Sequence, residues 1–203
     1  MKKQKITHSL QSTSPLFLLL LAAFALLFLS SCATLKKSDC VEGNWSGIGF
    51  NDATAGLKSS SQFRAHAKAC SKHRITPNVA DYSSGYQKGL AQFCTTTNGY
   101  KRGIDKSEYY GVCPLAIQNN FLKGYLSGLN TATIELTEDI ADLRHNRRRA
   151  IRQHRKAESQ EEPNTKNIKK LLARINRLES SIKSRRSNRR QLRRWYELWA
   201  IKL

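Results

Sequence analysis

Residues 168–182 read IKKLLARINRLESSI and repeat an apolar residue at alternating spacings of three and four. The apolar positions are Ile168, Leu171, Ile175, Leu178 and Ile182, followed at the same spacing by Arg185, Arg189, Leu192, Tyr196 and Trp199. This spacing lines side chains up along one side of a helix, as in the seam of a coiled coil. The stretch therefore predicts a long helix that packs its apolar side against a second helix.

The same spacing occurs earlier in the chain. Its positions are Leu129, Thr133, Leu136, Ile140, Leu143, Arg147, Ala150, His154 and Ala157. The sequence SQEEPNT at residues 159–165 interrupts it, because its proline stops the first helix and its Thr165 can cap the second. We therefore expect an antiparallel helical hairpin over residues 129–203. The residue numbers of two facing positions are expected to sum to about 322, which places Ile140 near Ile182.

Positive charge is concentrated in the predicted hairpin. The 203 residues carry a formal net charge of +20. Residues 144–203 contain 20 Lys and Arg against five Glu, a net charge of +15. Residues 32–143 are close to neutral, at about +2. Such asymmetry indicates two regions with different roles.

The N-terminus has the pattern of a targeting signal. Three lysines before residue 6 precede a 14-residue apolar run at 16–29. The run suits the core of a signal peptide and is shorter than the roughly 20 residues that span a bilayer. Residues 29–32, LSSC, then resemble the lipobox of bacterial lipoproteins. The resemblance implies cleavage before Cys32 and lipidation of its thiol, with 1–31 as lipoprotein signal peptide and 32–39 as lipidated tether.

Two other interpretations of this N-terminus stay open, an ordinary cleaved signal peptide and an uncleaved anchor helix. Lipoproteins of the lipobox type that lack Asp after the lipidated cysteine usually go to the outer membrane, and here Ala33 follows Cys32. The resemblance therefore implies a protein held on the bacterial outer membrane by a lipid anchor that includes palmitate. It would face the periplasm.

Four further cysteines lie in the near-neutral part of the chain. They are Cys40, Cys70, Cys94 and Cys113. In an oxidising compartment an even set predicts two disulfides, for which three connectivities exist. If successive helices alternate in direction, Cys94 ends one helix and Cys113 begins the next at the same end of the bundle. That geometry favours Cys94–Cys113 together with Cys40–Cys70.

A metal site is the competing interpretation of these cysteines. His66, Cys70 and His73 are spaced by four and three residues, so they share one side of a helix. No CxxC pair accompanies them, whereas zinc is usually held by three or four nitrogen and sulfur ligands. We expect neither a metal nor a cofactor. No Ser-His-Asp, phosphate-loop or paired acid–base pattern predicts catalytic residues, so no enzyme is expected.

Residues 40–128 predict a small, mainly α domain that the disulfides staple. An irregular or strand-like opening is expected at 40–52 because of its glycines. Asn51 or Asp52 is the expected N-cap of a first helix over 53–73.

The rest of this domain is expected to hold two more helices. The first covers residues 79–94. A turn at 95–99 and a loop rich in Gly and Tyr up to residue 112 follow it. Pro114 then suits the first turn of the next helix.

Two stretches of this region repeat each other. YxxGYxxGL at residues 82–90 matches FxxGYxxGL at residues 121–129. Glycine costs roughly 1 kcal/mol in a helix interior, so we expect it to mark close packing between antiparallel neighbouring helices. The alternative is a binding groove lined by tyrosines. Those tyrosines are Tyr82, Tyr86, Tyr109 and Tyr110.

These residues also carry a resemblance to a known family. They are Trp45-x-x-Ile48-Gly49-x-x-Asp52, Cys70, the first glycine motif, Cys94, Asn98-Gly99 and Tyr109-Tyr110-Gly111-Val112-Cys113-Pro114. Residues from about 40 to 129 resemble a family of bacterial lipoproteins labelled domain of unknown function 2799. The family tends to have Gly where Ala53 stands, so the turn there is expected to differ. The resemblance implies a lipoprotein of the cell envelope and brings no activity with it.

Two arginine clusters in the hairpin are the candidate anion-binding residues. They are Arg147, Arg148, Arg149 and Arg152, and Arg185, Arg186, Arg189, Arg190, Arg193 and Arg194. The planar guanidinium forms paired hydrogen bonds with phosphate or carboxylate. We therefore expect a non-catalytic binding or structural module that engages lipopolysaccharide, peptidoglycan or envelope proteins. Nucleic acid is not expected in that compartment. A solvated helix surface, a scaffold that pairs through its seam, and an envelope enzyme are the alternatives.

Overall fold

The computed structural model describes residues 35–203, so the apolar run and Cys32 lie outside the described residues. Seven helices and no strand make up the regular structure of this part, which confirms the mainly α class. None of these seven helices combines the length and the apolar character that a membrane crossing requires. By its contacts the described chain divides into two units, residues 35–43 with 65–77, and residues 44–64 with 78–203.

The first unit contains α2 (Lys37–Glu42) and the C-terminal part of α4 (Ser59–Ser71). A disulfide joins Cys40 of α2 to Cys70 of α4. Both cysteines are fully buried, as expected for the core of so small a unit. The helical α2 replaces part of the irregular or strand-like opening that the sequence predicted.

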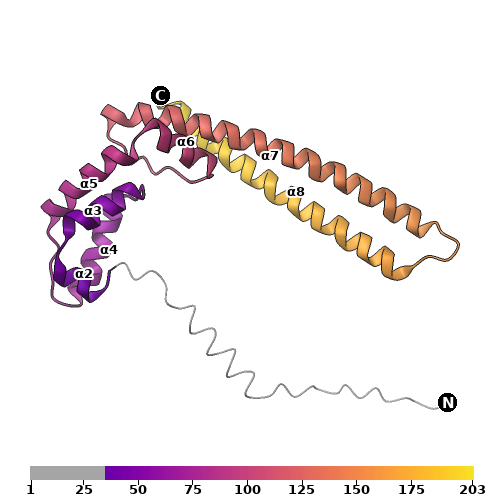
Figure 1. Ribbon diagram of the computed structural model, residues 1–203, viewed down its shortest axis with the longest axis horizontal. Helices are drawn as coiled ribbons and strands as arrows, with labels where there is room; N and C mark the ends of the chain where they lie inside the picture. The colour runs from indigo at the N-terminus through magenta and orange to yellow at the C-terminus, as the bar shows by residue number, and fades with distance from the viewer. Residues whose placement is uncertain (1–34) are drawn as a thin grey trace, which may run out of the picture. The chain divides into compact units, whose positions relative to one another are not determined.

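The second unit contains two helix pairs and a long hairpin (Figure 1). Its helices are α3 (Trp45–Thr54), α5 (Val79–Phe93), α6 (Thr96–Ile104), α7 (Leu115–Glu158) and α8 (Thr165–Ala200). Helix α3 packs on α5, α6 packs on the first part of α7, and the rest of α7 packs on α8. A disulfide joins Cys94 to Cys113. The predicted pairing, Cys40–Cys70 with Cys94–Cys113, is therefore confirmed.

Glycines hold α3 against α5. A Cβ atom added at Gly85 would meet the backbone of Ser46, and one added at Gly89 would meet the carbonyl of Phe50. The contacting residue numbers increase together, from Ser46 with Gly85 to Phe50 with Gly89. Helices α3 and α5 therefore run in the same direction. The glycines do mark close packing, but the expectation of antiparallel neighbours was wrong for this pair. The partner is a short helix that the sequence did not predict.

Helix α6 meets α7 in the same way. A Cβ atom at Gly124 would meet the carbonyl of Thr96, and one at Gly128 would meet the carbonyl of Tyr100. Those carbonyl positions lie 50 residues after their counterparts, Ser46 and Phe50, in α3. The repeated sequence motif therefore belongs to a duplicated structural unit.

Tyrosine hydrogen bonds confirm this duplication. The hydroxyl of Tyr86 donates to the carbonyl of Leu57 (2.6 Å), and that of Tyr125 donates to the carbonyl of Ser107 (3.0 Å). Both bonds tie the second helix of a pair to the loop that follows the first helix. The two acceptors are again 50 residues apart in the sequence.

Two predictions about the glycine-rich stretches were wrong. Asn51 and Asp52 lie inside α3 and do not cap it. The N-cap is Asn44, whose side chain accepts a hydrogen bond from the amide of Gly47 (2.9 Å). The helix expected over 53–73 is broken at Gly56, which has a φ of 74°. Left-handed backbone of this kind ends helices.

The turn expected at 95–99 is the beginning of α6. The side chain of Thr95 accepts a hydrogen bond from the amide of Asn98 (3.2 Å) and caps the helix. Glycines at 99 and 103 suggested a loop, but both are buried against α7. The prediction of a helix beginning at Pro114 is confirmed, because α7 begins at Leu115.

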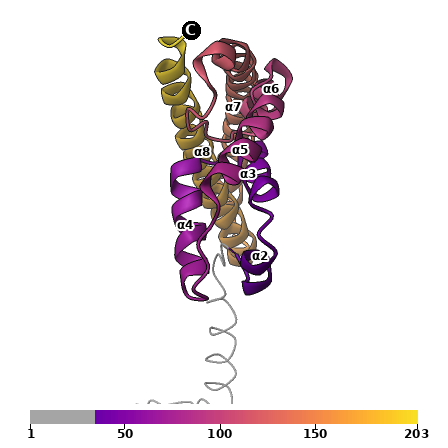
Figure 2. The same cartoon turned by 90° about the vertical axis from the view of Figure 1, so that its left-hand side faces the viewer.

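The antiparallel hairpin is confirmed. Helices α7 and α8 lie side by side in both views, joined by residues 159–164 (Figures 1 and 2). The ion pairs Arg147–Glu179 and Arg185–Asp139 have residue numbers that sum to 326 and 324, close to the expected 322. The buried seam residues include Leu136, Ile140, Ala150, Ala157, Ile182 and Leu192. Helix α7 runs without interruption through residues 128 and 129, where the sequence predicted a boundary.

Candidate anion-binding groove

Three of the candidate arginines lie in the seam of the hairpin, where apolar residues would be expected. Arg147, Arg185 and Arg189 are half-buried and each contacts the opposite helix. Arg147 is 3.5 Å from Glu179, Arg185 Nε donates to Asp139 (3.2 Å), and Arg189 donates to the hydroxyl of Thr137 (3.2 Å). Guanidinium groups therefore stand at seam positions of both helices, each with a polar partner on the opposite helix.

One hollow is a groove of about 450 Å³ between α7 and α8. It is lined by five cations, one carboxylate and a buried floor residue. These are Arg144, Arg147, Lys183, Arg186 and Arg190, with Glu179 and Ile182. We call this site the basic groove. Five positive charges against one negative charge leave a formal excess of four.

A second hollow lies nearer the base of the hairpin. This hollow of about 380 Å³ is lined by Thr133, Thr137, Arg189, Arg190 and Arg193, so the two share Arg190. Threonines at this place on α7 are small, so they leave open space opposite the arginines of α8. The two hollows therefore adjoin at Arg190, and we call them together the channel.

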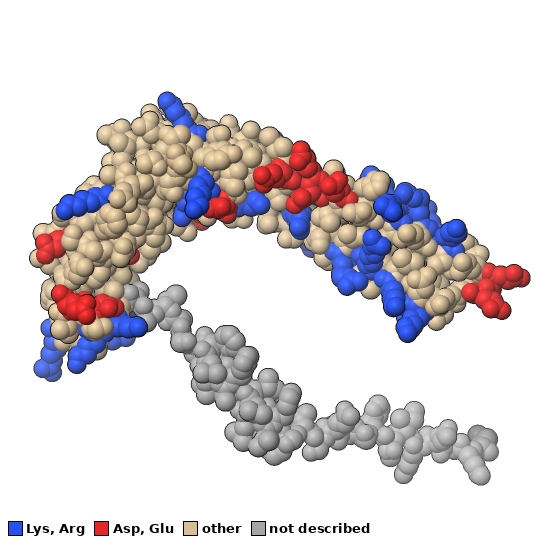
Figure 3. Space-filling view, viewed as in Figure 1, with Lys and Arg blue, Asp and Glu red and all other residues tan. Residues whose placement is uncertain are grey.

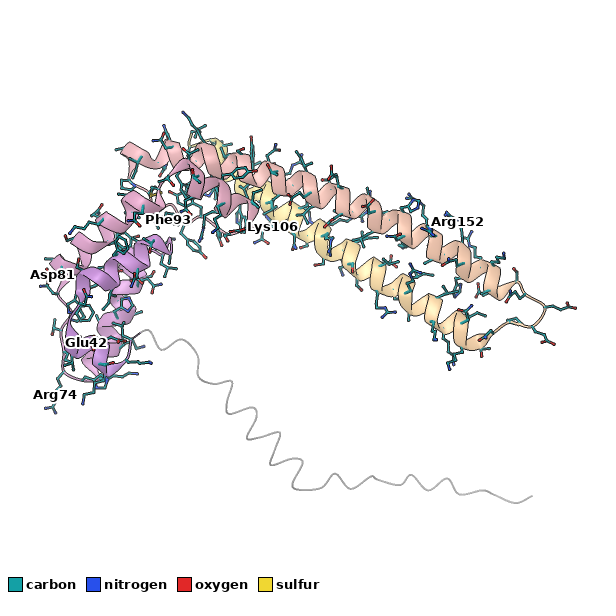
Figure 4. The ribbon with its side chains drawn as sticks, viewed as in Figure 1. Glu42, Arg74, Asp81, Phe93, Lys106 and Arg152 are labelled. Carbon is teal, nitrogen blue, oxygen red and sulfur yellow. A yellow bond between two sulfur atoms is a disulfide. The ribbon has the colours of Figure 1, made fainter. Side chains whose placement is uncertain are left out.

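The structure thus brings together part of both predicted clusters. Arg147, Arg186, Arg189, Arg190 and Arg193 line the channel. Arg148, Arg149, Arg152 and Arg194 are exposed and do not line it. Arg152 projects from the side of α7 that faces away from α8 (Figure 4). The prediction missed Lys183 as a candidate site residue, because an isolated lysine stands out only once the opposite helix is in place.

Charge is unevenly spread along the outer side of the hairpin. Acidic side chains gather on α7 nearer the helix pairs, and basic side chains follow them toward the tip (Figure 3). Glu135, Glu138, Asp139 and Asp142 supply the acidic part. Of these four, Asp139 forms the ion pair with Arg185.

The predicted tyrosine groove is formed in part, because Tyr82 and Tyr86 line one hollow and Tyr86 and Tyr110 line an adjoining one, whereas Tyr109 lines neither. Tyr82 and Tyr109 are buried, and the Tyr109 hydroxyl accepts a hydrogen bond from the amide of Cys113 (3.0 Å). Burial raises the pKa of Tyr109. Burial also raises the pKa of Tyr82, aided by its hydrogen bond to Asp52 (2.8 Å), and raises that of Tyr125 to about 12. These tyrosines serve mainly as core residues.

The alternative metal site lacks its sulfur ligand. Cys70 forms a disulfide with Cys40, so its sulfur is not a thiolate. His66 is buried near it, whereas His73 is exposed. Residues 35–203 hold no group of three or more side chains placed to bind a metal ion.

Residues 44–130 match the family described as "Protein of unknown function (DUF2799)". The match begins at Asn44, the N-cap of α3, and ends one residue after Leu129, so it spans both helix pairs. It supports the assignment of this segment to that domain family and leaves out the rest of the hairpin. No curated protein and no solved structure matches the chain.

Proposed function

We propose that this chain is a bacterial lipoprotein, held on the outer membrane through Cys32, whose hairpin binds anionic components of the cell envelope. The observation that carries the binding proposal is the basic groove, in which two helices place five cations around one carboxylate. The lipid anchor rests on the apolar run and the LSSC sequence at 29–32, both outside the described residues.

The basic groove has the chemistry of a phosphate site. Its cations come from helices and are fixed at their bases by the packed hairpin. The Nε atom of Arg147 is buried and has no hydrogen-bond partner among the described residues. Guanidinium groups pair well with phosphate oxygens. The phosphates of lipopolysaccharide are therefore the first candidate ligand, and the carboxylates of peptidoglycan are the second.

Excess charge gives a second physical reason for an anionic partner. The net charge of +15 over residues 144–203 makes this region repel itself, and bound anions would relieve that repulsion. Within residues 35–203, Arg147, at 37% side-chain exposure, forms an ion pair with Glu179, at 62% exposure. An ion pair this exposed contributes little stability by itself.

The binding test uses the full chain in a non-ionic detergent, with lipopolysaccharide-coated beads and peptidoglycan sacculi as probes. Binding should weaken as salt rises. The variant Arg186→Gln/Arg190→Gln should lower affinity about tenfold or more, since charge-assisted hydrogen bonds contribute roughly 1.5–3 kcal/mol each. The control Arg174→Gln/Arg177→Gln removes the same charge from exposed positions of α8 outside the groove. Equal losses in both variants, or no salt-sensitive binding to either probe, would contradict the proposal.

The lipid anchor is tested separately. Replacement of Cys32 by Ser should abolish incorporation of labelled palmitate in cells and move the protein from the membrane to the soluble fraction. Mass spectrometry of the wild-type N-terminal peptide should find a mature chain beginning at Cys32. Palmitate labelling that persists in the variant would exclude this anchor.

The scaffold alternative needs the hairpin to open. Leu136, Ile140 and Ile182 are buried between α7 and α8, so the seam is already occupied within one chain. A partner that pairs through the same seam would have to displace one of the two helices.

A further inference from the structure

We infer that the outer side of α7 is a self-complementary surface, through which two copies of this chain pair in antiparallel fashion. The surface is a strip of seven exposed residues spaced alternately by three and four, which places them on one side of the helix. They are Glu135, Glu138, Asp142, His145, Arg149, Arg152 and Lys156. We call this set the charged strip.

Charge changes sign once along the charged strip. Its first three residues are acidic, its last three are basic, and His145 lies at the centre. The strip extends over 22 residues, or about 32 Å of helix. Figure 3 shows the same order along α7, with acidic side chains followed by basic ones toward the tip.

The charged strip is poorly suited to an isolated helix. Glu138 and Asp142 are like charges four residues apart, and so are Arg152 and Lys156. Like charges at this spacing destabilise a helix, whereas Glu followed by Lys at the same spacing stabilises it. No ion pair within the described residues engages any member of the strip. The segregated pattern therefore gains nothing inside one chain.

An antiparallel second copy satisfies every charge of the strip. Two α7 helices related by a twofold axis at His145 would place positions whose numbers sum to 290 opposite each other. Glu138 would then face Arg152 of the second copy, and Asp142 would lie beside its Arg149. Glu135 would lie beside Lys156. Each contact occurs twice because a twofold interface uses the same patch on both chains.

The opposite arrangement is excluded by the same charges. In a parallel pair, acidic residues would face acidic residues and arginines would face arginines. Charge complementarity therefore sets the direction of pairing as well as the partner. Ala141, exposed beside the strip near the axis, is small enough to let the two helices approach closely.

The resulting dimer should be weak and sensitive to salt. Exposed ion pairs contribute little individually, and two chains of net charge +20 repel each other at long range. A salt concentration of about 0.1 M screens charges beyond roughly 10 Å, which suppresses the long-range repulsion and keeps the contact pairs. At about 1 M the screening length falls to roughly 3 Å, and the contact pairs should be lost as well.

This inference does not rest on the proposed function. The residues of the strip lie outside the basic groove, although Arg149 and Arg152 were among the candidate anion-binding residues. Loss of anion binding in groove variants would leave self-association unchanged. The two proposals can therefore fail separately.

Charge exchange tests the inference in the full chain in non-ionic detergent. Sedimentation at about 0.1 M salt should show a monomer–dimer equilibrium that shifts to monomer at about 1 M. Glu138→Arg should weaken dimerisation at least tenfold, because it sets two cations against each other. Glu138→Arg/Arg152→Glu restores complementarity between two identical copies and should restore the dimer. A wild-type monomer at every concentration, or a double variant as monomeric as the single one, would overturn the inference.

A cysteine at the proposed axis gives an independent readout. His145→Cys places two thiols together at the axis of the proposed antiparallel dimer, so mild oxidation should yield a disulfide-linked dimer on non-reducing electrophoresis. The charge exchange above separates this arrangement from a parallel pair, in which residue 145 would also face itself. Asn176→Cys, at an exposed position on α8, is the matched control and should stay monomeric. Equal cross-linking of both variants would show random collision and contradict the inference.

Discussion

Gly85 of α5 and Gly124 of α7 hold the same place in two successive helix pairs, each against a backbone carbonyl of a short helix. The carbonyls belong to Ser46 and Thr96. Neither position has room for a Cβ atom, so both pairs depend on glycine where helix propensity alone would disfavour it. The cost of glycine in a helix is offset by contact between two backbones.

Replacement of Gly124 by Ala should therefore destabilise the protein by about 2–3 kcal/mol, because the new methyl group would force α6 away from α7. Urea unfolding of the full chain measures the change. Ser127→Ala, an exposed position one turn away, is the control and should change stability by less than about 0.5 kcal/mol. If Gly124→Ala were as stable as the control, the backbones of α6 and α7 would have to leave room for a Cβ atom, contrary to the structure.

Removal of the bridge in Cys94→Ala/Cys113→Ala should lower the free energy of unfolding by about 2–4 kcal/mol, since the bridge closes a loop with a sequence separation of 19. Non-reducing peptide mapping of the wild-type protein should recover Cys94 linked to Cys113 and Cys40 linked to Cys70. A free thiol at Cys94 would contradict the first of these bridges, and a free thiol at Cys70 would contradict the second.

Arg189→Leu should stabilise the hairpin by about 1 kcal/mol. Arg189 is half-buried at a seam position, and leucine would bury apolar area there without an ionic group to desolvate. The same variant should weaken binding to lipopolysaccharide beads, because Arg189 lines the channel. Thermal unfolding should therefore show a higher melting temperature, and the bead assay should show weaker binding, for the same variant. A fall in melting temperature would show that the contact with Thr137 matters more than burial.

Alkaline pH should destabilise the helix pairs. Burial raises the pKa of Tyr125 from 10.0 to about 12, so the folded state keeps a proton that the unfolded state loses first. The stability from this difference is complete below about pH 10 and is lost as pH rises toward 12. Urea unfolding at a series of pH values should show this decline. In Tyr125→Phe it should be smaller, and an unchanged decline would assign the effect to other groups.

The longer helices, α5, α7 and α8, were predictable from the sequence. Spacings of three and four gave the hairpin, Asn78 caps the helix expected from residue 79, and Pro114 precedes α7. The short helices α3 and α6 were missed, since their glycines are typical of turns and become favourable only through contact with another helix. Asn44 and Thr95, each accepting a hydrogen bond from an amide three residues later, were the signals that would have found them.

The candidate site was predictable only in part. Sequence located the arginines on both helices but could not say which of them share a surface, because that depends on the register of the hairpin. A shift of about three residues from the expected register decides which cations meet Glu179. Tyr196 shows the same limit, since it is 41% exposed although its spacing placed it in the seam.

Trp199 packs on Tyr109, with ring centroids 4.6 Å apart, although 90 residues separate them in the sequence. The contact can form only after the whole of α8 has been synthesised and has folded back along α7. Both helix pairs and both disulfides involve residues that emerge earlier. The order of synthesis therefore makes the hairpin the last part to close.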